Sequence, residues 1–407
     1  MEESRAESSK RRSTRILWIV PVAVDMHLYV SDVMQALAHL EEHGHSATML
    51  SFRSKNFARP RNLHMQLIPV RYVPGISQIV TTLILAFLLP FYVALSNPAY
   101  VMMNPDVSTL SSLPSIIVSK FKKTKFILDI RSTPVETVGS RGTLQRFWFA
   151  ASVLVAKRFF DGMTTITPLM RKEICDDFNL SSERIGIWTS GVSTSLFNPE
   201  KHSEEAIALR QALGLSDKFV VFYHGVFSAS RGLTETLGAI KILKQKCPNI
   251  ALFLLGSGPL LDRLKSMVDE LGLQHNVIIH NSVGHEQVPA FICLSDVCIL
   301  PLQFSPYWRY QCPLKLLEYL SMKKVAIVTD LPANRMVIGD AKCGIYLSSV
   351  EPLEIAESIE YAYANKDKLE NWGEFGRPIV EEKYTWEKVV ASLEKYLLSV
   401  ACDPVQS

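Results

Sequence analysis

The sequence predicts an α/β protein made of two doubly wound, Rossmann-like domains that face each other across a cleft. Three observations lead to this prediction. The chain has 407 residues, more than one compact core usually holds. Short apolar runs alternate with stretches of helical spacing, which is typical of a mainly parallel sheet covered by helices on both faces. The alternation stops at a polar stretch near residue 200 and then restarts, so we expect two copies of one architecture.

The predicted first domain, residues 15–200, opens with a strand, a helix and a strand. Ile16–Val20 is a short apolar run, Val30–Glu42 has helical spacing, and His43-Gly44 is a helix stop. The other elements expected here are the strands Ala47–Phe52, Tyr100–Met103, Lys125–Ile130, Met163–Thr167 and Arg184–Trp188 and the helix Leu113–Phe121. Residues 1–14 are polar and lack the apolar core of a signal peptide, so we expect a disordered tail.

The predicted second domain, residues 201–384, repeats the pattern after the polar stretch Asn198–Glu205. Its expected strands are Phe219–Tyr223, Ile250–Leu255, Val277–His280, Val297–Leu300 and Val325–Thr329. Its expected helices are Leu233–Lys246, Leu260–Leu271, Gln287–Cys293 and Leu314–Ser321. Sheets of this kind bind ligands beyond the carboxyl ends of their strands, so we expect a site on the loops that leave those ends.

Charge and cysteine content narrow the function classes. The net charge is +3, there is no acidic residue between Ser51 and Pro105, and a basic cluster follows at Lys120, Lys122, Lys123 and Lys125. A basic face attracts the phosphates of a membrane, a nucleic acid or a substrate, or it is only a solvated surface. No nucleic-acid motif accompanies it, so a nucleic acid is the weakest of these partners. The 7 cysteines lack C-x-x-C spacing, which favours a reducing cytosolic compartment over zinc or disulfides.

Residues 76–95, "ISQIVTTLILAFLLPFYVAL", carry no charge and are long enough to cross a bilayer. Polar residues weaken the first half and Pro90 interrupts the second. Because the α/β pattern continues on both sides, a single span would split a domain. A buried or interfacial helix is therefore favoured over a span, and contact with a membrane face suits the basic flanks.

Three loops of the second domain carry residues suited to a phosphate. "YHGVFSASRGL", residues 223–233, holds Arg231 between two glycines, and "LLGSGPLL", residues 254–261, places Gly256 and Gly258 ahead of a helix. Glycines allow close backbone approach and an arginine fork suits a phosphate, although glycine-rich turns are also common punctuation.

The third loop is "CPLKLLEYLSMKK", residues 312–324. Pro313 suits the first helical position, where the free N–H groups and the positive end of the helix dipole attract anions. Lys315 adds a cation, and Glu318 one turn later can accept hydrogen bonds from the hydroxyls of a ribose. At a spacing of three residues these two could instead form a weak surface pair. With the two glycine loops, the set describes a nucleoside diphosphate pocket.

The ordered motifs resemble the retaining glycosyltransferases of the GT-B fold, specifically glycosyltransferase family 4 (group 1), over about residues 183–400. "ERIGIWTSGVSTSLFNP" is similar to the family's "V-x-V-I-x-N-G-V-D-x-x-x-F-x-P", and "YHGVFSASRGL" is similar to "Y-x-G-x-x-x-x-x-K-G-L". "LFLLGSGP", "NVIIHNSVGHEQVPAFICLSDVCILPL" and "PLKLLEYLSMKKVAIVTD" follow in the family's order. The tail "YTWEKVVASLEKYL" resembles the helix, here 385–400, that returns to the N-terminal domain.

The resemblance implies an N-terminal acceptor domain, a C-terminal nucleotide-sugar donor domain and a set of site residues. The implied catalytic residues are Arg231, Lys315 and Glu318. The implied donor-binding residues are His224, Gly225, Ser228, Arg231, Gly232, Gly256, Gly258, Pro259, His285, Val288, Pro313, Lys315, Leu316 and Glu318. On the acceptor side it places Asp25, His27, Asp129 and Arg131, for which a structural role is also open.

Several positions depart from the family pattern. Tyr310 stands where the first glutamate of the family's E-x7-E pair is expected, and Glu318 fits the second. Val226 occupies the usual arginine position, while Arg231 stands for the lysine. The N-terminal loop lacks the usual glycine pair, and Arg131 replaces a histidine. These departures leave open a divergent enzyme or an inactive relative.

The function that the resemblance implies is metal-independent, retaining hexosyl transfer from a nucleoside-diphosphate sugar to a lipid-linked or cell-surface glycan. There is no D-x-D motif, so we expect no metal cofactor. The expected location is the cytoplasm, peripheral at the cytoplasmic membrane face, with no nucleic-acid partner. The alternative is an inactive nucleotide-sugar binder that is the partner subunit of an active transferase.

Overall fold

The computed structural model describes residues 14–23, 28–53, 64–71, 76–134 and 139–402. It divides into two compact units, each considered by itself. The first unit comprises the chain up to Thr189 together with Trp386 onward, and the second unit is Ser190–Thr385. The boundary between them thus lies at Thr189 and Ser190, ahead of the position near residue 200 that the polar stretch indicates.

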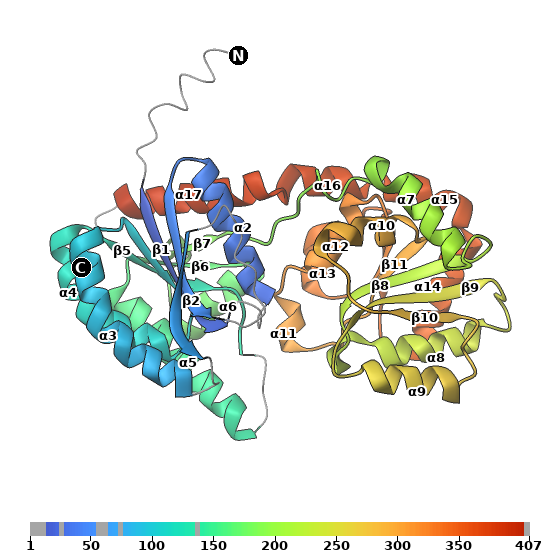
Figure 1. The fold of residues 1–407 in the computed structure, drawn as a ribbon, viewed down its shortest axis with the longest axis horizontal. Helices are drawn as coiled ribbons and strands as arrows, with labels where there is room; N and C mark the ends of the chain where they lie inside the picture. The colour runs from blue at the N-terminus through green and yellow to red at the C-terminus, as the bar shows by residue number, and fades with distance from the viewer. Residues whose placement is uncertain (1–13, 24–27, 54–63, 72–75, 135–138, 403–407) are drawn as a thin grey trace, which may run out of the picture. The chain divides into compact units, whose positions relative to one another are not determined.

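The first unit contains a parallel sheet with strand order β3-β2-β1-β4-β5-β6-β7 (Figure 1). Its strands are β1 (Arg15–Ala23), β2 (Ser46–Arg53), β3 (His64–Arg71), β4 (Tyr100–Met103), β5 (Lys125–Ile130), β6 (Gly162–Thr165) and β7 (Ile185–Ile187). Its helices are α2 (Leu28–Glu42), α3 (Ile76–Ser96), α4 (Leu113–Lys122), α5 (Gly139–Phe159), α6 (Pro168–Phe178) and α17 (Trp386–Cys402), with a 3-10 turn, η1, at Val107–Ser112.

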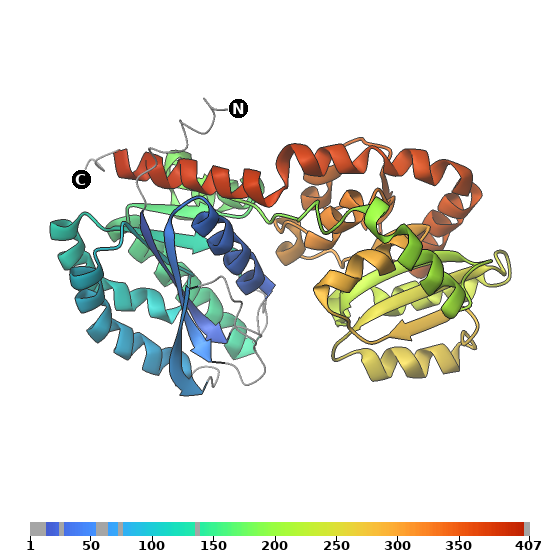
Figure 2. The same ribbon diagram turned by 45° about the horizontal axis from the view of Figure 1, so that its top comes forward.

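The C-terminal helix α17 is part of the first unit's core, where it lies along α2 (Figure 2). Its apolar residues recur at helical spacing and are buried with those of β1 and α2; they are Trp386, Val389, Val390, Leu393, Leu397 and Val400. Tyr396, at the edge of the same face, donates a hydrogen bond to the carbonyl of Arg184 and accepts one from the N–H of Met163. The amphipathic pattern of the tail therefore forms a helix that completes the first unit.

The second unit contains a parallel sheet with strand order β10-β9-β8-β11-β12-β13, the same winding as the first six strands of the other unit. Its strands are β8 (Phe219–Val226), β9 (Ile250–Ser257), β10 (Val277–His280), β11 (Val297–Leu300), β12 (Ala326–Thr329) and β13 (Gly344–Leu347). Its helices are α7 (Pro199–Ala212), α8 (Leu233–Leu243), α9 (Leu261–Glu270), α10 (Val288–Cys293), α11 (Pro306–Arg309), α12 (Leu314–Ser321), α13 (Pro332–Ile338), α14 (Pro352–Ala364), α15 (Lys366–Gly373) and α16 (Gly376–Lys383).

The predicted fold class, two doubly wound parallel α/β domains, is confirmed. The strands β3 and β13 and several helices of the second unit were not predicted from the sequence. A polar break was also predicted at Asn198–Glu205, whereas Asn198 caps a helix that starts at Pro199 by accepting a hydrogen bond from the N–H of Glu200. This helix is largely exposed, so its polar composition hides it from a search for apolar periodicity.

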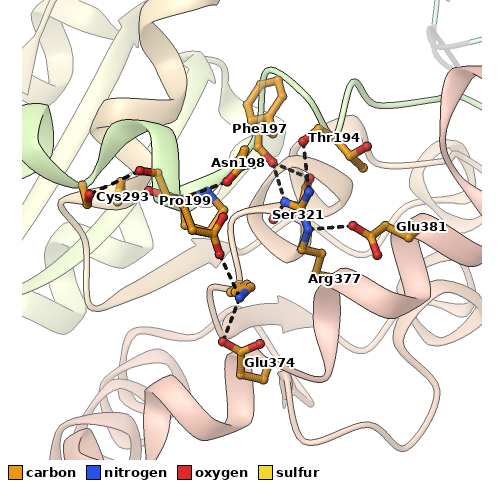
Figure 3. Close-up of polar contacts among 12 residues, drawn as sticks. Thr194, Phe197, Asn198, Pro199, Cys293, Ser321, Glu374, Arg377 and Glu381 are labelled. Carbon is orange, nitrogen blue, oxygen red and sulfur yellow. Dashed lines mark hydrogen bonds and ion pairs between the residues drawn. The ribbon is translucent and has the colours of Figure 1, made fainter.

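The segment that enters the second unit is held by Arg377 of α16 (Figure 3). The guanidinium of Arg377 donates hydrogen bonds to the carbonyl oxygens of Thr194, Phe197 and Ser321 and pairs with Glu381 at 2.7 Å. The hydroxyl of Ser321 also donates to the carbonyl of Phe197, at 2.8 Å. The entry segment, α12 and α16 are therefore joined at one point.

The apolar segment 76–95 forms α3, an outer helix of the first unit. It is the one helix within the described ranges that is long and apolar enough to cross a membrane, over Ile79–Ser96, and 22% of that window is buried. A mainly buried core helix, one of the two favoured interpretations of this segment, is therefore wrong, because most of this helix faces outward.

Candidate functional site

The candidate site lies at the carboxyl ends of β8, β9 and β11 in the second unit. The strand order turns at β8, which has β9 on one side and β11 on the other. Doubly wound sheets bind ligands at such a switch point because the loops there diverge to opposite faces. The loops that leave β8 and β9 are the two glycine loops of the sequence, and the segment after β11 leads to α11 and α12.

The glycines of these loops are required by close contacts. Gly225 has φ of 121°, and a Cβ there would overlap the side chain of Lys315, whose Nζ would be 2.9 Å away. Gly258 has φ of 153°, and its Cβ would lie 2.5 Å from the carbonyl oxygen of Phe227. Gly232 and Gly256 also have positive φ and meet backbone atoms of Pro301 and Gly225. The loops after β8 and β9 thus pack backbone on backbone, and Lys315 lies directly over the first of them.

Helix α12 spans Leu314–Ser321 as predicted, and Pro313 is its N-cap, one position before the first helical residue. The carbonyl of Pro313 accepts the N–H of Leu316 at 2.9 Å, while its own ring has no N–H to satisfy. The start of α12 therefore presents the positive end of the helix dipole beside the ammonium of Lys315.

Glu318 lies one turn into α12 and is buried, with a relative exposure of 7%. His224 Nε2, at the end of β8, is 3.1 Å from Oε2 of Glu318, and His285 Nδ1 is 4.0 Å from Oε1. Burial by itself would raise the pKa of the Glu318 carboxyl, yet His224, His285 and Lys315 together hold that pKa below its ordinary value. Burial lowers the pKa of His224, so this imidazole is neutral at pH 7 and can donate a hydrogen bond to an ionised Glu318.

Arg231 is the second cation of the site and is also buried, with an exposure of 7%. Its guanidinium carbon lies 4.2 Å above the ring of Trp308 in α11, and its Nε has no hydrogen-bond partner among the described residues. Within the described part of the chain no carboxylate lies at ion-pair distance from Arg231. A buried guanidinium without a counter-charge is costly, so this position is suited to binding an anion.

The positive charge of Arg231 also changes the pKa of Lys315. Burial and the positive charge of Arg231 lower the pKa of its ammonium group from 10.5 to about 7, although Glu318 opposes this shift. Two cationic side chains and a helix start thus converge with little negative charge to offset them. A ligand carrying several negative charges would remove this imbalance.

Trp308 also belongs to the candidate site, although the sequence did not predict it. It lies in the aromatic stretch "FSPYWRY", residues 304–310, where Ser305 caps α11 by accepting a hydrogen bond from the N–H of Trp308. A tryptophan face is a favourable surface for a guanidinium, so Trp308 holds Arg231 in place. The cluster of aromatic residues in this stretch could have indicated a binding site, but the sequence does not show that Trp308 packs against Arg231.

His285 is held by the entry segment of the second unit. Its ring centroid is 5.3 Å from that of Phe197, whose carbonyl is bound by Arg377 and Ser321 (Figure 3). Ser321 follows Glu318 on α12, so one set of contacts fixes both the helix and the aromatic ring beside His285. These contacts show what Phe197 does in the stretch "ERIGIWTSGVSTSLFNP": its ring packs against His285 and its carbonyl anchors α12 and α16.

Other predicted donor residues are placed less favourably. Leu316 is fully buried and its N–H donates to the carbonyl of Pro313, so its assignment to the donor site stays a prediction. Val288 is buried at the start of α10, and its N–H donates to the carbonyl of His285. Ser228 and Pro259 lie on the loops after β8 and β9 with accessible surface. Tyr310 ends α11, half-buried.

In the first unit, two of the residues assigned to the acceptor side make structural contacts in the core. Arg131 is buried, pairs with Asp32 at 2.6 Å and donates to the carbonyl of Trp188 at 2.7 Å. Asp129 is also buried and accepts hydrogen bonds from Thr164 and Trp188. Their side chains are engaged in the core, which agrees with the structural role that the sequence left open, and a role toward the acceptor stays a prediction. Asp25 and His27 lie outside the described residues.

No group of three His, Cys, Asp or Glu side chains that could hold a metal ion is found where the structure describes the chain.

Comparison with known proteins finds a family match within the second unit. Residues 206–378 match the family described as "Glycosyl transferases group 1". An alpha-D-kanosaminyltransferase of Streptomyces kanamyceticus is 23% identical over 220 residues, which are 54% of this chain and 55% of that protein. A GDP-mannose-dependent alpha-(1-6)-phosphatidylinositol monomannoside mannosyltransferase of Mycolicibacterium smegmatis is 29% identical over 111 residues, 27% of this chain and 28% of the relative. The chain thus matches about half the length, or less, of these relatives.

A solved structure shows the same fold over nearly the whole chain. The Anabaena protein Alr3699/HepE, crystallised in complex with UDP, superposes with a TM-score of 0.74 at 13% identity, covering 95% of this chain and 100% of that one. This likeness shows a common fold, which is that of GT-B glycosyltransferases. The chain therefore has the GT-B fold, and its residues 206–378 match the group 1 glycosyl transferases.

Proposed function

We propose that this protein is a glycosyltransferase that moves a hexosyl group from a nucleoside-diphosphate sugar and retains the anomeric configuration. The observation that carries the proposal is the convergence of Arg231, Lys315 and the start of α12 beside the buried carboxylate of Glu318. Cations suit a diphosphate, and a carboxylate one turn deeper suits the hydroxyls of a ribose. The family of residues 206–378 supports the same reaction class.

The proposed mechanism places positive charge where negative charge develops. When the bond between the sugar and the diphosphate breaks, charge grows on the leaving phosphate. Arg231, held on Trp308, and Lys315 stabilise it, and the positive end of α12 adds to their effect. These groups would do so without a metal ion. Glu318 and His224 hold the nucleoside and sugar in place, and retention can follow from attack on the face that the leaving group vacates.

The acceptor in this proposal is a lipid-linked or cell-surface glycan, handled by the first unit at the cytoplasmic face of a membrane. The name of the mycobacterial relative includes a phosphatidylinositol mannoside, and the outward apolar face of α3 is consistent with work at a lipid surface. The second candidate function is an inactive nucleotide-sugar binder that assists an active transferase. Tyr310 and Val226 favour it, since both stand where the family carries charged residues.

Thermal unfolding of the purified chain with UDP, GDP, ADP and their sugar conjugates tests the donor proposal. A ligand that binds only the folded protein raises the melting temperature by mass action, by an amount that grows with its concentration over Kd. We expect one nucleotide to give a clear increase, and inorganic phosphate at equal concentration is the control. Hydrolysis of the donor, or transfer from it, would then exclude the inactive alternative. An unchanged melting temperature with every nucleotide would contradict the donor site.

The pH dependence of nucleotide binding is expected to follow Lys315. Its pKa is about 7 in the empty site, and a bound diphosphate raises it, so above pH 7 binding must take up a proton. Affinity is therefore expected to fall between pH 7.5 and 9.5, by up to about tenfold per pH unit. Within this window the diphosphate is already ionised. The lowered pKa of His224 keeps that imidazole neutral, and the pKa of Tyr223 is raised to about 12.

Titration calorimetry in two buffers of different ionisation enthalpy measures this proton uptake directly. The matched controls are Lys315→Arg, which is charged throughout the range, and Lys315→Met, which is never charged. Both should give a flat pH profile and no proton uptake, Lys315→Met with the weaker binding. A wild-type profile that is equally flat would show that Lys315 does not titrate on binding.

A further inference from the structure

The first unit carries an outward apolar surface on α3. One stripe of this helix, Thr81, Leu85, Leu89 and Val93, recurs every fourth residue and is at most 5% exposed, so it packs against the unit. The rest of the helix turns large apolar side chains to solvent: Ile79, Val80, Leu83, Ile84, Phe87, Leu88, Phe91 and Leu95. Phe87 and Leu95 are exposed by 68% and 84%. A surface of this kind marks an interaction site, because scattered exposure does not place so many apolar groups on one element.

The neighbouring helix α4 extends this surface. It packs beside α3 in the first unit (Figures 1 and 2) and exposes Leu113, Ile117 and Phe121. Ile117 and Phe121 are four residues apart and therefore lie on one face of α4, with exposures of 67% and 84%. Ile116 and Ser119 on the opposite face are buried. We call the exposed apolar residues of α3 and α4 together the α3–α4 surface.

The exposed charged residues between Ile76 and Thr124 have one sign. Lys120, Lys122 and Lys123 are exposed at the end of α4. The single acidic residue between Ile76 and Thr124 is Asp106, and its carboxylate accepts hydrogen bonds from the N–H and the hydroxyl of Ser108 at the start of η1. Apolar side chains with lysines at their edge match a bilayer, in which anionic head groups lie above the acyl chains.

Two other occupants fit the observations less well. A bilayer span would require α3 to leave the unit, yet its Thr81–Val93 stripe is packed there and β3 and β4 flank it on either side in the sequence. A second copy of this chain would bring the lysine cluster toward another cationic rim, unless the two surfaces were offset. The lysines thus favour an anionic partner.

We propose that the α3–α4 surface docks the first unit on an anionic lipid bilayer, with α3 lying in the interface and Lys120, Lys122 and Lys123 on the head groups. This deepens the proposed membrane location by naming the elements and the lipid chemistry, and it does not depend on the transfer reaction. Docking of this kind would bring the first unit close to an acceptor that is itself anchored in lipid.

Co-sedimentation of the full chain with vesicles tests the docking. Vesicles of phosphatidylcholine alone are compared with vesicles that contain phosphatidylglycerol, and we expect binding to the second kind that weakens as salt is added. The triple variant Leu83→Gln, Phe87→Gln, Phe91→Gln should lose binding to the vesicles that contain phosphatidylglycerol, by more than about tenfold for each residue that enters the acyl region. The triple variant Lys120→Gln, Lys122→Gln, Lys123→Gln should bind anionic vesicles on the order of 100-fold more weakly, since each lysine contributes about fivefold.

The matched control replaces exposed apolar residues of the second unit. Ile207→Gln with Leu353→Gln changes side chains that are 58% and 59% exposed, and vesicle binding should be unaffected. The nucleotide-dependent melting temperature, measured on every variant, reports folding and the donor site separately from lipid binding. Failure of wild-type protein to bind either vesicle would overturn the docking without touching the donor site. A dimer in solution that the α3 variant converts to a monomer would assign the surface to a second copy instead.

Discussion

Replacing Glu318 with alanine is expected to abolish sugar transfer and nucleotide-dependent stabilisation while the protein remains folded. The carboxylate is buried, is kept ionised by His224, His285 and Lys315, and has no other acid beside it among the described residues that could take its place. Each hydrogen bond from a ribose hydroxyl to a charged group contributes about 1.5–3 kcal/mol. Loss of two such bonds predicts a decrease in kcat/KM of roughly 100-fold or more.

The isosteric variant Glu318→Gln separates charge from shape. It keeps an oxygen and an amide at the same place, so we expect partial nucleotide binding but slower transfer than in the wild type. Glu357→Ala, on the exposed side of α14, is the matched control and should leave both properties unchanged. Turnover and melting temperature of the three variants test whether the Glu318 carboxylate takes part in binding and transfer. Full turnover in Glu318→Ala would show that it does not.

Replacing Arg131 with alanine is expected to destabilise the first unit strongly. Arg131 pairs with buried Asp32, donates to the carbonyl of Trp188 and lies 3.7 Å above the ring of Trp188. Asp129 is also buried. Burial raises the pKa of its carboxyl group, and the positive charge of Arg131 opposes this shift. Removing the guanidinium leaves two buried carboxylates without their cation. Breaking a buried pair from one side costs about 3–5 kcal/mol, which corresponds to a fall on the order of 10 °C in melting temperature.

Calorimetric unfolding of Arg131→Ala measures this cost, and the double variant Arg131→Met with Asp32→Asn is its control. The double variant removes the opposing charge as well, so its loss of stability should be smaller than that of Arg131→Ala. The result also decides between the two roles that the sequence left open for this residue. A melting temperature within about 2 °C of the wild type, together with lost transfer, would return Arg131 to the acceptor side.

The local pattern of the chain was enough to predict the fold class and the core of the candidate site. Alternating apolar runs and helical spacings predicted two doubly wound domains, because the periods of strand and helix are set by residues close in sequence. The same holds for the glycines after β8 and β9 and for the start of α12. Lys315 and Glu318 are three positions apart, so one helix brings them together whatever surrounds it.

Contacts between distant residues could be decided only by the tertiary structure. Arg131 and Asp129 look like exposed residues at a strand end, yet the fold places Asp32 and Trp188 against them and closes that position. Trp308 gains its role from Arg231, which precedes it by three strands and three α-helices. The apolar residues of α3 divide into a packed stripe and an outward face that composition alone cannot distinguish. Sequence determines the periodicity and chemistry of each element, whereas burial and pairing depend on which elements the folded chain brings into contact.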